Sequence, residues 1–418
     1  MKDKSACLRQ DEADRLRGLR GQFQLNDDEI YLDGNSLGVL PRATPARVRQ
    51  MVEEEWGEGL IRSWNTAGWI DLPARLGDKI ARLVGANAGE LVVADSTSVN
   101  LYKAMSAALS IVRADAPGRT RIVSERSNFP TDLYIAEGLA RQYGMTLELV
   151  EPDEIPAQLD DRLAVLMLTH VNYRTGRMHD MAALTRDAHD AGALAVWDLA
   201  HSAGAVPVDL NGAQADFAVG CGYKYLNGGP GAPAFVWAHA RHADRFSQPL
   251  SGWMGHAAPF QFTPDYQPAP GIARYLCGTP PLLSMAALEC GIDTVLAAEP
   301  LGGMAALREK SVALTELFIE LVEARCAGHG LVLASPRDAA QRGSQVCFAR
   351  QEGAYAIVQA LIERGVIGDF RAPDILRFGF TPLYTRYVDV WNAAERLEQV
   401  LSEGAWREAR FQRQAAVT

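Results

Sequence analysis

Short apolar runs alternate with segments of helical periodicity between residues 72 and 238 of the chain. The run Leu163–Thr169 is continuously apolar, which is typical of a strand in a parallel sheet that is covered on both faces. Strands that alternate with helices form βαβ units, so the pattern predicts an open, mostly parallel sheet. The expected strands are Leu91–Ala94, Arg121–Ser124, Leu147–Val150, Leu163–Thr169, Leu194–Asp198, Asp216–Gly222 and Phe235–Ala238. The expected helices are Leu72–Val84, Leu101–Ile111, Leu133–Tyr143 and Met181–Ala191.

The flanking segments follow other patterns. The pattern predicts one amphipathic helix over residues 1–25 and a second helix over residues 42–58. It places Trp64 and Trp69 in a polar loop. Residues 258–281 are rich in proline and aromatic side chains and show no regular period. Beyond them the pattern predicts a smaller α/β unit. Its expected elements are the helices Pro281–Leu296, Ala305–Ala327, Ala354–Glu363 and Val388–Leu401 and the strands Ser344–Ala349, Val366–Phe370 and Ile375–Gly379.

The length of 418 residues is too great for one simple core, so we expect two domains. We assign residues 46–290 to a large domain and residues 291–418 to a small C-terminal domain. Residues 1–45 are expected to form an N-terminal segment that packs with the small domain.

The net charge of −10 argues against a nucleic-acid partner, which a basic patch would attract. No apolar run reaches the length of a membrane span, and the charged N-terminus lacks the apolar core of a signal peptide. The six cysteines are scattered without a CxxC pair, which favours reduced thiols over a zinc site or disulfides. We therefore expect a cytoplasmic protein with neither a nucleic-acid nor a membrane partner.

Polar residues follow the ends of several expected strands. Because ligands of open α/β sheets bind outside the carboxyl ends of the strands, convergence of these residues at one edge indicates a binding site. The Ser/Thr-rich turn at residues 95–100 also precedes a helix, a geometry that can bind a phosphate, although Ser and Thr cap ordinary helices as well. The strand-end residues are Thr97, Asp132, Thr169, Asp198 and His201.

Lys224 is the most unusual polar residue of the chain. It follows an apolar run and precedes a glycine-rich loop, in a chain that has only six lysines. A lysine in such surroundings can serve as a Schiff-base nucleophile, whereas the plainer interpretation is a surface lysine at a strand end. Arg377 lies among apolar neighbours, where it could hold a carboxylate or form a salt bridge between domains.

Taken together, these residue types fit pyridoxal 5′-phosphate. Lys224 would bind the cofactor covalently, and Asp198 would pair with its pyridinium nitrogen. Thr97 and Ser98 would hold its phosphate. No HExxH or similar spacing supports a metal site, so we expect no metal.

The motifs Asp198–His201 and Gly222–Leu226 resemble those of fold-type I pyridoxal-phosphate enzymes of the class V aminotransferase group. Within that group the chain is most similar to the kynureninases. This resemblance implies an α/β fold of the fold-type I PLP-dependent transferase type. Its large domain would hold a mixed, mostly parallel seven-stranded sheet flanked by helices, and a smaller α/β domain would follow. The matching segments are Leu32–Gly38, Asn128–Asp132, Trp197–Ala205, Cys221–Gly231 and Gly278–Pro281.

The resemblance also implies an activity, the hydrolysis of L-kynurenine to anthranilate and L-alanine in tryptophan catabolism, with 3-hydroxykynurenine less favoured. It implies a homodimer with shared active sites and catalytic roles for Lys224, Tyr223 and Asp198. Substrate contacts would come from Ser36, Trp64 and Arg377. The implied cofactor-binding residues are Thr97, Ser98, Phe129, Pro130, Thr131, Asp132, Thr169, Asp198, His201, Tyr223, Lys224, Trp253 and Thr279.

Some observations keep other interpretations open. Trp64 and Thr279 stand where the animal enzymes carry histidine and asparagine, so the preference between the two substrates is inferred less directly. Another class V enzyme, an aminotransferase or a cysteine desulfurase, is the nearest alternative. A desulfurase needs a reactive cysteine on a mobile loop, whereas Cys326 and Cys347 fall in an expected helix and strand. A non-catalytic cofactor carrier could lack Arg377 and Tyr223, but both are present.

Overall fold

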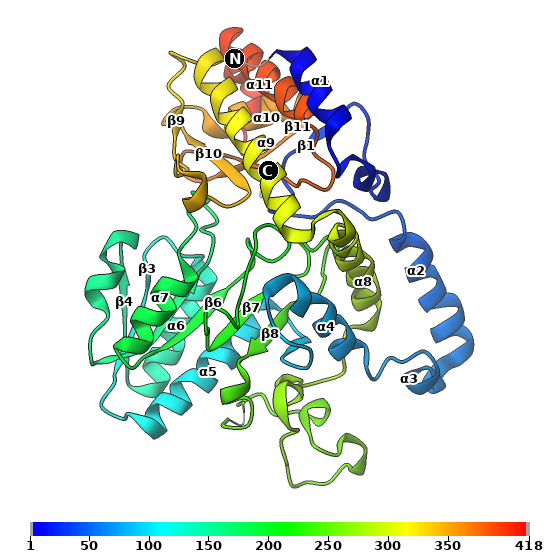
Figure 1. Ribbon diagram of the computed structural model, residues 1–418, viewed down its shortest axis with the longest axis vertical. Coiled ribbons are helices and arrows are strands. Elements are labelled where there is room, and N and C mark those ends of the chain that lie inside the picture. Colours follow the sequence, from blue (N-terminus) through cyan, green and yellow to red (C-terminus); the bar gives the residue numbers. More distant parts are fainter. Residues whose placement is uncertain (1–2, 247, 415–418) are drawn as a thin grey trace.

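A seven-stranded sheet forms the centre of the larger part of the molecule (Figure 1). The computed structural model describes residues 3–246 and 248–414. The strand order is β2-β8-β7-β6-β5-β3-β4, and β8 runs antiparallel to both of its neighbours, β2 and β7. The strands are β2 (Leu91–Val93), β3 (Arg121–Glu125), β4 (Thr146–Val150), β5 (Leu163–Thr169), β6 (Leu194–Asp198), β7 (Phe217–Gly220) and β8 (Phe235–Ala238).

Helices cover both faces of this sheet. Successive residues of β5 point to opposite faces: Leu166 packs in the core with α4 and α8, and Met167 packs in the core with α5 and α6. Each such buried side chain contributes about 1.5–3 kcal/mol of transfer free energy, which explains why the strand is apolar throughout. The helices are α4 (Leu72–Val84), α5 (Thr97–Asp115), α6 (Pro130–Tyr143), α7 (Met181–Asp190) and α8 (Leu282–Leu296).

The C-terminal part builds its own core around a four-stranded antiparallel sheet of order β12-β13-β10-β9. The sequence-based prediction of a mixed, mostly parallel seven-stranded sheet followed by a smaller α/β domain is confirmed. The elements of this part are α9 (Gly303–Arg325), β9 (Val332–Leu333), β10 (Gln345–Ala349), α10 (Ala354–Glu363), β11 (Val366–Ile367), β12 (Asp369–Arg371), β13 (Ile375–Gly379) and α11 (Tyr387–Ser402).

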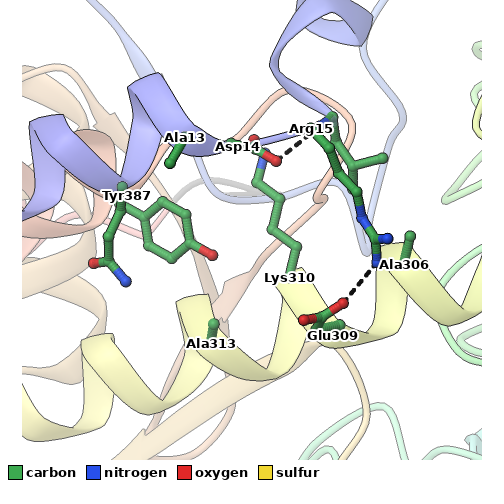
Figure 2. Close-up of a pocket in the computed structure, with 10 residues that line it drawn as sticks. Ala13, Asp14, Arg15, Ala306, Glu309, Lys310, Ala313 and Tyr387 are labelled. Atoms are coloured by element: carbon green, nitrogen blue, oxygen red, sulfur yellow. Dashed lines mark hydrogen bonds and ion pairs between the residues drawn. The ribbon is translucent and has the colours of Figure 1, made fainter. Parts of the chain in front are cut away.

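The N-terminal segment lies against this C-terminal part. Helix α1 (Lys4–Ala13) packs beside α11 (Figure 1), and β1 (Ile30–Tyr31) forms a parallel pair with β11. Figure 2 shows Lys310 of α9 directed toward Asp14, with 2.7 Å between Nζ and Oδ2. Arg15 reaches Glu309 of the same helix at 2.7 Å. The buried Lys310 thereby anchors the segment.

Several expected boundaries were wrong for local reasons. The helix expected over residues 1–25 is interrupted because Asp14 has an extended backbone and accepts a hydrogen bond from the Leu16 amide; a 3-10 helix then spans Arg17–Gln22. The strand expected at Val366–Phe370 is divided by Gly368 into β11 and β12, which pair with different sheets. A side chain that binds the backbone accompanies the first break, and a change of pairing partner accompanies the second.

Residues 44–66 are helical, so the helix expected over residues 42–58 begins two residues later and extends further. Helix α2 (Thr44–Gln50) continues as a π-helix over Met51–Gly59, and the short helix α3 (Ser63–Thr66) carries Trp64, which was expected in a loop. Segment 258–281 is irregular as expected, with only short 3-10 turns such as Gly271–Tyr275. Within the described residues, no helix combines the length and apolar character needed to cross a membrane.

Candidate active site

A cavity of about 130 Å³ opens at the carboxyl ends of the parallel strands. It brings together nine of the residues expected at a site, and the convergence predicted from the strand ends is therefore present. Pro130 and Thr131 lie in the first turn of α6, directly beside it. The predicted residues that line the cavity are Thr97, Ser98, Phe129, Asp132, Thr169, Asp198, His201, Tyr223 and Lys224.

Lys224 follows β7 and extends its amine into this cavity. Its Nζ lies 3.0 Å from Nε2 of His201 and 5.6 Å from the centre of the Tyr223 ring. Burial lowers the pKa of His201 well below its usual range, and the Lys224 charge adds to that effect. His201 is therefore a neutral ring that can accept a hydrogen bond from the amine.

The loop that carries Lys224 is fixed by the N-terminal segment. The Gly38 amide donates to the Tyr223 carbonyl at 2.8 Å. A Cβ at Gly38 would lie 2.5 Å from the Lys224 carbonyl oxygen, so only glycine allows this approach. The Gly38 end of the segment Leu32–Gly38 thus supports the lysine loop.

Two buried carboxyl groups, Asp132 of α6 and Asp198 at the end of β6, face each other across Thr169. The Thr169 hydroxyl is 3.4 Å from Asp132 Oδ2 and 3.5 Å from Asp198 Oδ2. Burial, with the adjacent Asp198 charge, raises the pKa of Asp132 well above its usual range. Burial also raises the pKa of Asp198, but Lys224 and a 2.8 Å hydrogen bond from the Ala200 amide oppose the rise. The pair therefore holds a proton on Asp132 and a negative charge on Asp198.

The opposite end of the cavity is the N-terminus of α5. This helix begins at Thr97, four residues earlier than predicted, because the Ser96 hydroxyl caps it by accepting from the Val99 amide at 3.3 Å. Thr97 and Ser98 are consequently in the first turn, where backbone amides lack partners and the helix dipole favours an anion.

Phe129 and Tyr173 form an aromatic part of the cavity wall. Phe129 precedes α6 and is 43% exposed, and its ring meets that of Tyr173 edge-on at 5.3 Å. The Tyr173 backbone carbonyl accepts a 2.7 Å hydrogen bond from Arg377 Nη1, which comes from β13 of the small domain. The cavity wall is thus connected directly to the C-terminal part.

Arg377, expected to hold a carboxylate, belongs to a buried ion cluster next to the cavity. Its Nη2 donates to Ser36 Oγ at 2.7 Å and also pairs with Asp369. Arg371 contacts the same two acceptors, Ser36 at 3.3 Å and Asp369 at 2.6 Å. The Arg377 Nε is buried without a hydrogen-bond partner, so the guanidinium retains a donor for a further acceptor.

Three predicted residues lie apart from this cavity in the single chain. Trp64 packs edge-on against Trp253 at 6.2 Å, and Thr279 is exposed. None of the three lines the cavity of this chain.

Similar proteins identify the chain. A family model described as the kynureninase C-terminal domain matches residues 307–397. Curated kynureninases from Burkholderia pseudomallei (strain K96243) and Pseudomonas fluorescens are each 58% identical over 421 residues, covering 100% of this chain and 100% of either relative. The chain belongs to the kynureninase family. The family resemblance inferred from the motifs is thereby confirmed.

Solved structures show which fold this kynureninase family member adopts. A cysteine desulfurase from Thermococcus onnurineus NA1 superposes with a TM-score of 0.77 at 18% identity, covering 92% of this chain and 98% of that one. A mutant of C-DES with glycine covalently linked to the PLP cofactor gives a TM-score of 0.76 at 17% identity. The match covers 91% of this chain and 98% of the C-DES chain. These likenesses concern the fold alone and confirm the expected fold-type I architecture.

Family membership does not favour the desulfurase alternative, and neither do the thiols considered in the sequence. Cys326 ends α9 and Cys347 lies in β10, and both are buried. Burial raises the pKa of Cys326 to about 12 and that of Cys347 to about 11. Both thiols are therefore poor nucleophiles.

Sequence reasoning missed some residues of the site. Tyr173 and Ser96 line the cavity, and Gln345 of β10 contacts His201. Ser96 and Tyr173 lie in loops that follow expected strands, so their positions could have suggested them. Gln345 gives no such signal, because it starts an otherwise apolar strand 144 residues beyond His201.

Proposed function

We propose that the chain is a kynureninase, a pyridoxal-phosphate-dependent hydrolase that cleaves L-kynurenine to anthranilate and L-alanine. The observation that carries this conclusion is full-length identity of 58% to kynureninases, combined with a cavity that contains Lys224 beside a carboxyl pair. The physiological context we propose is tryptophan catabolism.

The residues of the cavity fit the cofactor. The Lys224 amine can form the covalent link, and the negative charge on Asp198 suits a pyridinium nitrogen. The first turn of α5 suits a phosphate, with Thr97 and Ser98 as hydroxyl donors. The exposed Phe129 ring suits stacking on an aromatic ring. His201, Thr169, Asp132, Pro130 and Thr131 would complete the surroundings of the ring.

Pyridoxal phosphate, when bound, supplies an electron sink for negative charge that develops next to the substrate amino group. The protein's own groups do the rest. Asp198 keeps its charge in a buried site, where it favours a proton on the ring nitrogen. We infer that Lys224 Nζ moves the proton of the substrate Cα and that the Tyr223 hydroxyl donates a proton to the substrate Cβ.

We infer further that Arg377 and Ser36 bind the substrate carboxylate. The unpartnered Arg377 Nε supports this role, because a carboxylate is the natural acceptor for an arginine fork. Trp64 is proposed to contact the aromatic part of the substrate and to favour L-kynurenine over 3-hydroxykynurenine. Comparing kcat/KM for the two substrates in wild type and Trp64→His tests that preference.

We propose that the enzyme is a homodimer with shared active sites. Apolar side chains are exposed on two segments that the contact between Trp64 and Trp253 joins. Trp56 is 57% and Ile61 77% exposed on the first segment, and Phe260 is 59% and Phe262 75% exposed on the second. Such a patch is unfavourable in water and suits a second copy of the chain. Trp253, which stacks on Phe262 at 6.3 Å, and Thr279 would then reach the phosphate of the partner's cofactor.

The division into an N-terminal segment (1–45), a large domain (46–290) and a small domain (291–418) is likewise proposed. The two cores and the packing of α1 on α11 support it. A cytoplasmic location is supported by the six cysteines, all of which are free.

The deciding experiment follows the absorption spectrum of the purified protein, and anthranilate fluorescence, before and after L-kynurenine is added. We expect a visible cofactor band that is lost in Lys224→Ala, together with rising anthranilate in the wild type. A cofactor band without anthranilate would overturn the activity, and no band after added cofactor would overturn the assignment of Lys224.

A further inference from the structure

Gln345 connects the small domain to the lysine of the active site. It begins β10, is completely buried and uses both ends of its amide. The amide nitrogen lies 3.2 Å from the Asn172 carbonyl and 3.0 Å from the Tyr173 carbonyl. Both of these partners can only accept, so the amide nitrogen must face them and the oxygen must face His201.

This orientation fixes the tautomer of His201. Gln345 Oε1 lies 3.1 Å from His201 Nδ1 and cannot donate, so Nδ1 carries the proton. A neutral ring with a proton on Nδ1 has a free lone pair on Nε2. That nitrogen lies 3.0 Å from Lys224 Nζ and is therefore the acceptor for the amine.

Burial keeps His201 neutral, and the charges around it act in the same direction. Lys224 on the lysine loop, and Arg371 and Arg377 on strands β12 and β13, all disfavour a second ring proton. The buried carboxyl pair Asp132 and Asp198 borders the same cavity. Gln345, on β10, adds no charge but supplies the acceptor that selects one neutral tautomer over the other.

We propose that Gln345 is a positioning residue that holds His201 in the Nδ1–H form. The free His201 Nε2 can then accept a hydrogen bond from the Lys224 amine. A strand of the small domain thereby controls the hydrogen bonding of the catalytic lysine. The same amide holds the Tyr173 carbonyl, which also accepts from Arg377. The Gln345 amide therefore supports both the lysine, through His201, and the proposed carboxylate site, through the Tyr173 carbonyl. The inference builds on the proposed role of Lys224.

The test measures the Lys224 amine in protein from which the cofactor has been removed. Competitive acetylation with acetic anhydride, read by mass spectrometry, gives the labelling rate of Lys224 at neutral pH. In Gln345→Leu the ring loses its acceptor at Nδ1 and takes the Nε2–H form, so the ammonium loses a hydrogen-bond acceptor. We expect labelling about tenfold faster, the effect of one lost hydrogen bond to a charged group.

Gln248→Leu is the matched control. Gln248 is similarly buried, but its amide bonds to the backbone of Leu250, so Lys224 labelling should stay at the wild-type rate. Equal Lys224 rates in Gln345→Leu and Gln248→Leu would overturn the proposal. So would a ring-nitrogen NMR spectrum of ¹⁵N-histidine-labelled protein, assigned with His201→Asn, that places the proton on Nε2 in the wild type.

Gln345→Met keeps the proposal testable if the leucine variant fails to fold. Its unbranched side chain is close to glutamine in size but offers Nδ1 no oxygen acceptor, so the ring proton of His201 should move to Nε2 in the same NMR experiment. A ring that kept its proton on Nδ1 would contradict the proposed contact. None of these measurements uses kynurenine or the bound cofactor, so they stand or fall separately from the proposed reaction.

Discussion

At the scale of single residues, the two carboxyl groups of the cavity have different tasks. Asp132 and Asp198 lie on either side of Thr169 and burial raises the pKa of both, but Asp198 also accepts a hydrogen bond from the Ala200 amide, which favours its charged form. One group therefore stores a proton while the other keeps a charge. A sequence shows two strand-end or helix-start aspartates, but it cannot show which one ionises, because that depends on distances across the sheet.

This difference predicts unequal effects of the same substitution. Asp198→Asn removes the buried charge that favours a protonated ring nitrogen, so kcat/KM for L-kynurenine should fall by at least about 100-fold. Asp132→Asn resembles the protonated carboxyl and should cost less than about tenfold. Anthranilate fluorescence measures both, and equal losses would show that the proton is not held on Asp132.

Asp33 gives a prediction about pH. Burial, with the nearby Asp369 charge, raises its pKa to about 7. The folded chain therefore binds more protons than the unfolded chain between about pH 4 and this value, so the free energy of unfolding falls as pH rises through that window. Asp33→Asn cannot ionise and should gain about 1–3 kcal/mol relative to wild type between pH 4.5 and pH 8.

Urea unfolding of the cofactor-free protein at the two pH values measures this gain. Asp161→Asn, at an exposed aspartate, is the control and should follow the wild type. A stability difference between Asp33→Asn and wild type that stays constant with pH would show that Asp33 is already ionised in the folded state.

At the scale of elements, the sequence predicted most strands and helices well, because their apolar periods come from burial on the two faces of one sheet. Helix boundaries were less predictable. The N-terminus of α5 depends on which of several hydroxyls caps it. The residue that follows α1, Asp14, forms an ion pair with Lys310, which is almost 300 residues away in the sequence. The connection from Gln345 to His201 is a contact between elements of different domains, which no local pattern encodes.

The contact between the N-terminal turn and the lysine loop carries a prediction at this scale. In Gly38→Ala the new methyl would lie 2.5 Å from the Lys224 carbonyl and 2.6 Å from Asn227 Cα, so one of the two loops must move. We expect a loss of about 1–3 kcal/mol in the free energy of unfolding and weaker cofactor retention. Gly18→Ala, where nothing lies within 4 Å of the new methyl, should change neither.

Thermal unfolding, together with cofactor absorbance after gel filtration, measures these effects. Gly38→Ala protein that retained wild-type stability and cofactor would mean that the turn and the loop are not in firm contact.

At the scale of the whole molecule, the proposed exchange of Trp253 between subunits predicts complementation. Lys224→Ala and Trp253→Ala should each be nearly inactive alone. After co-refolding, half of the dimers are mixed and each has one complete site, so about a quarter of the wild-type activity should return. If Trp253 served its own subunit, the mixture would stay inactive, because every site would then lack one of the two residues.

The pairing of β1 with β11 has a consequence for the order in which the molecule assembles. Ile30 leaves the ribosome early, but its partner Val366 is made 336 residues later. Domains tend to fold as units while synthesis continues, so the large sheet can form well before this late pair. The turn that supports the lysine loop then gains its anchor only when nearly the whole chain has emerged. A nascent chain would remain incompetent for catalysis until its C-terminal part is complete.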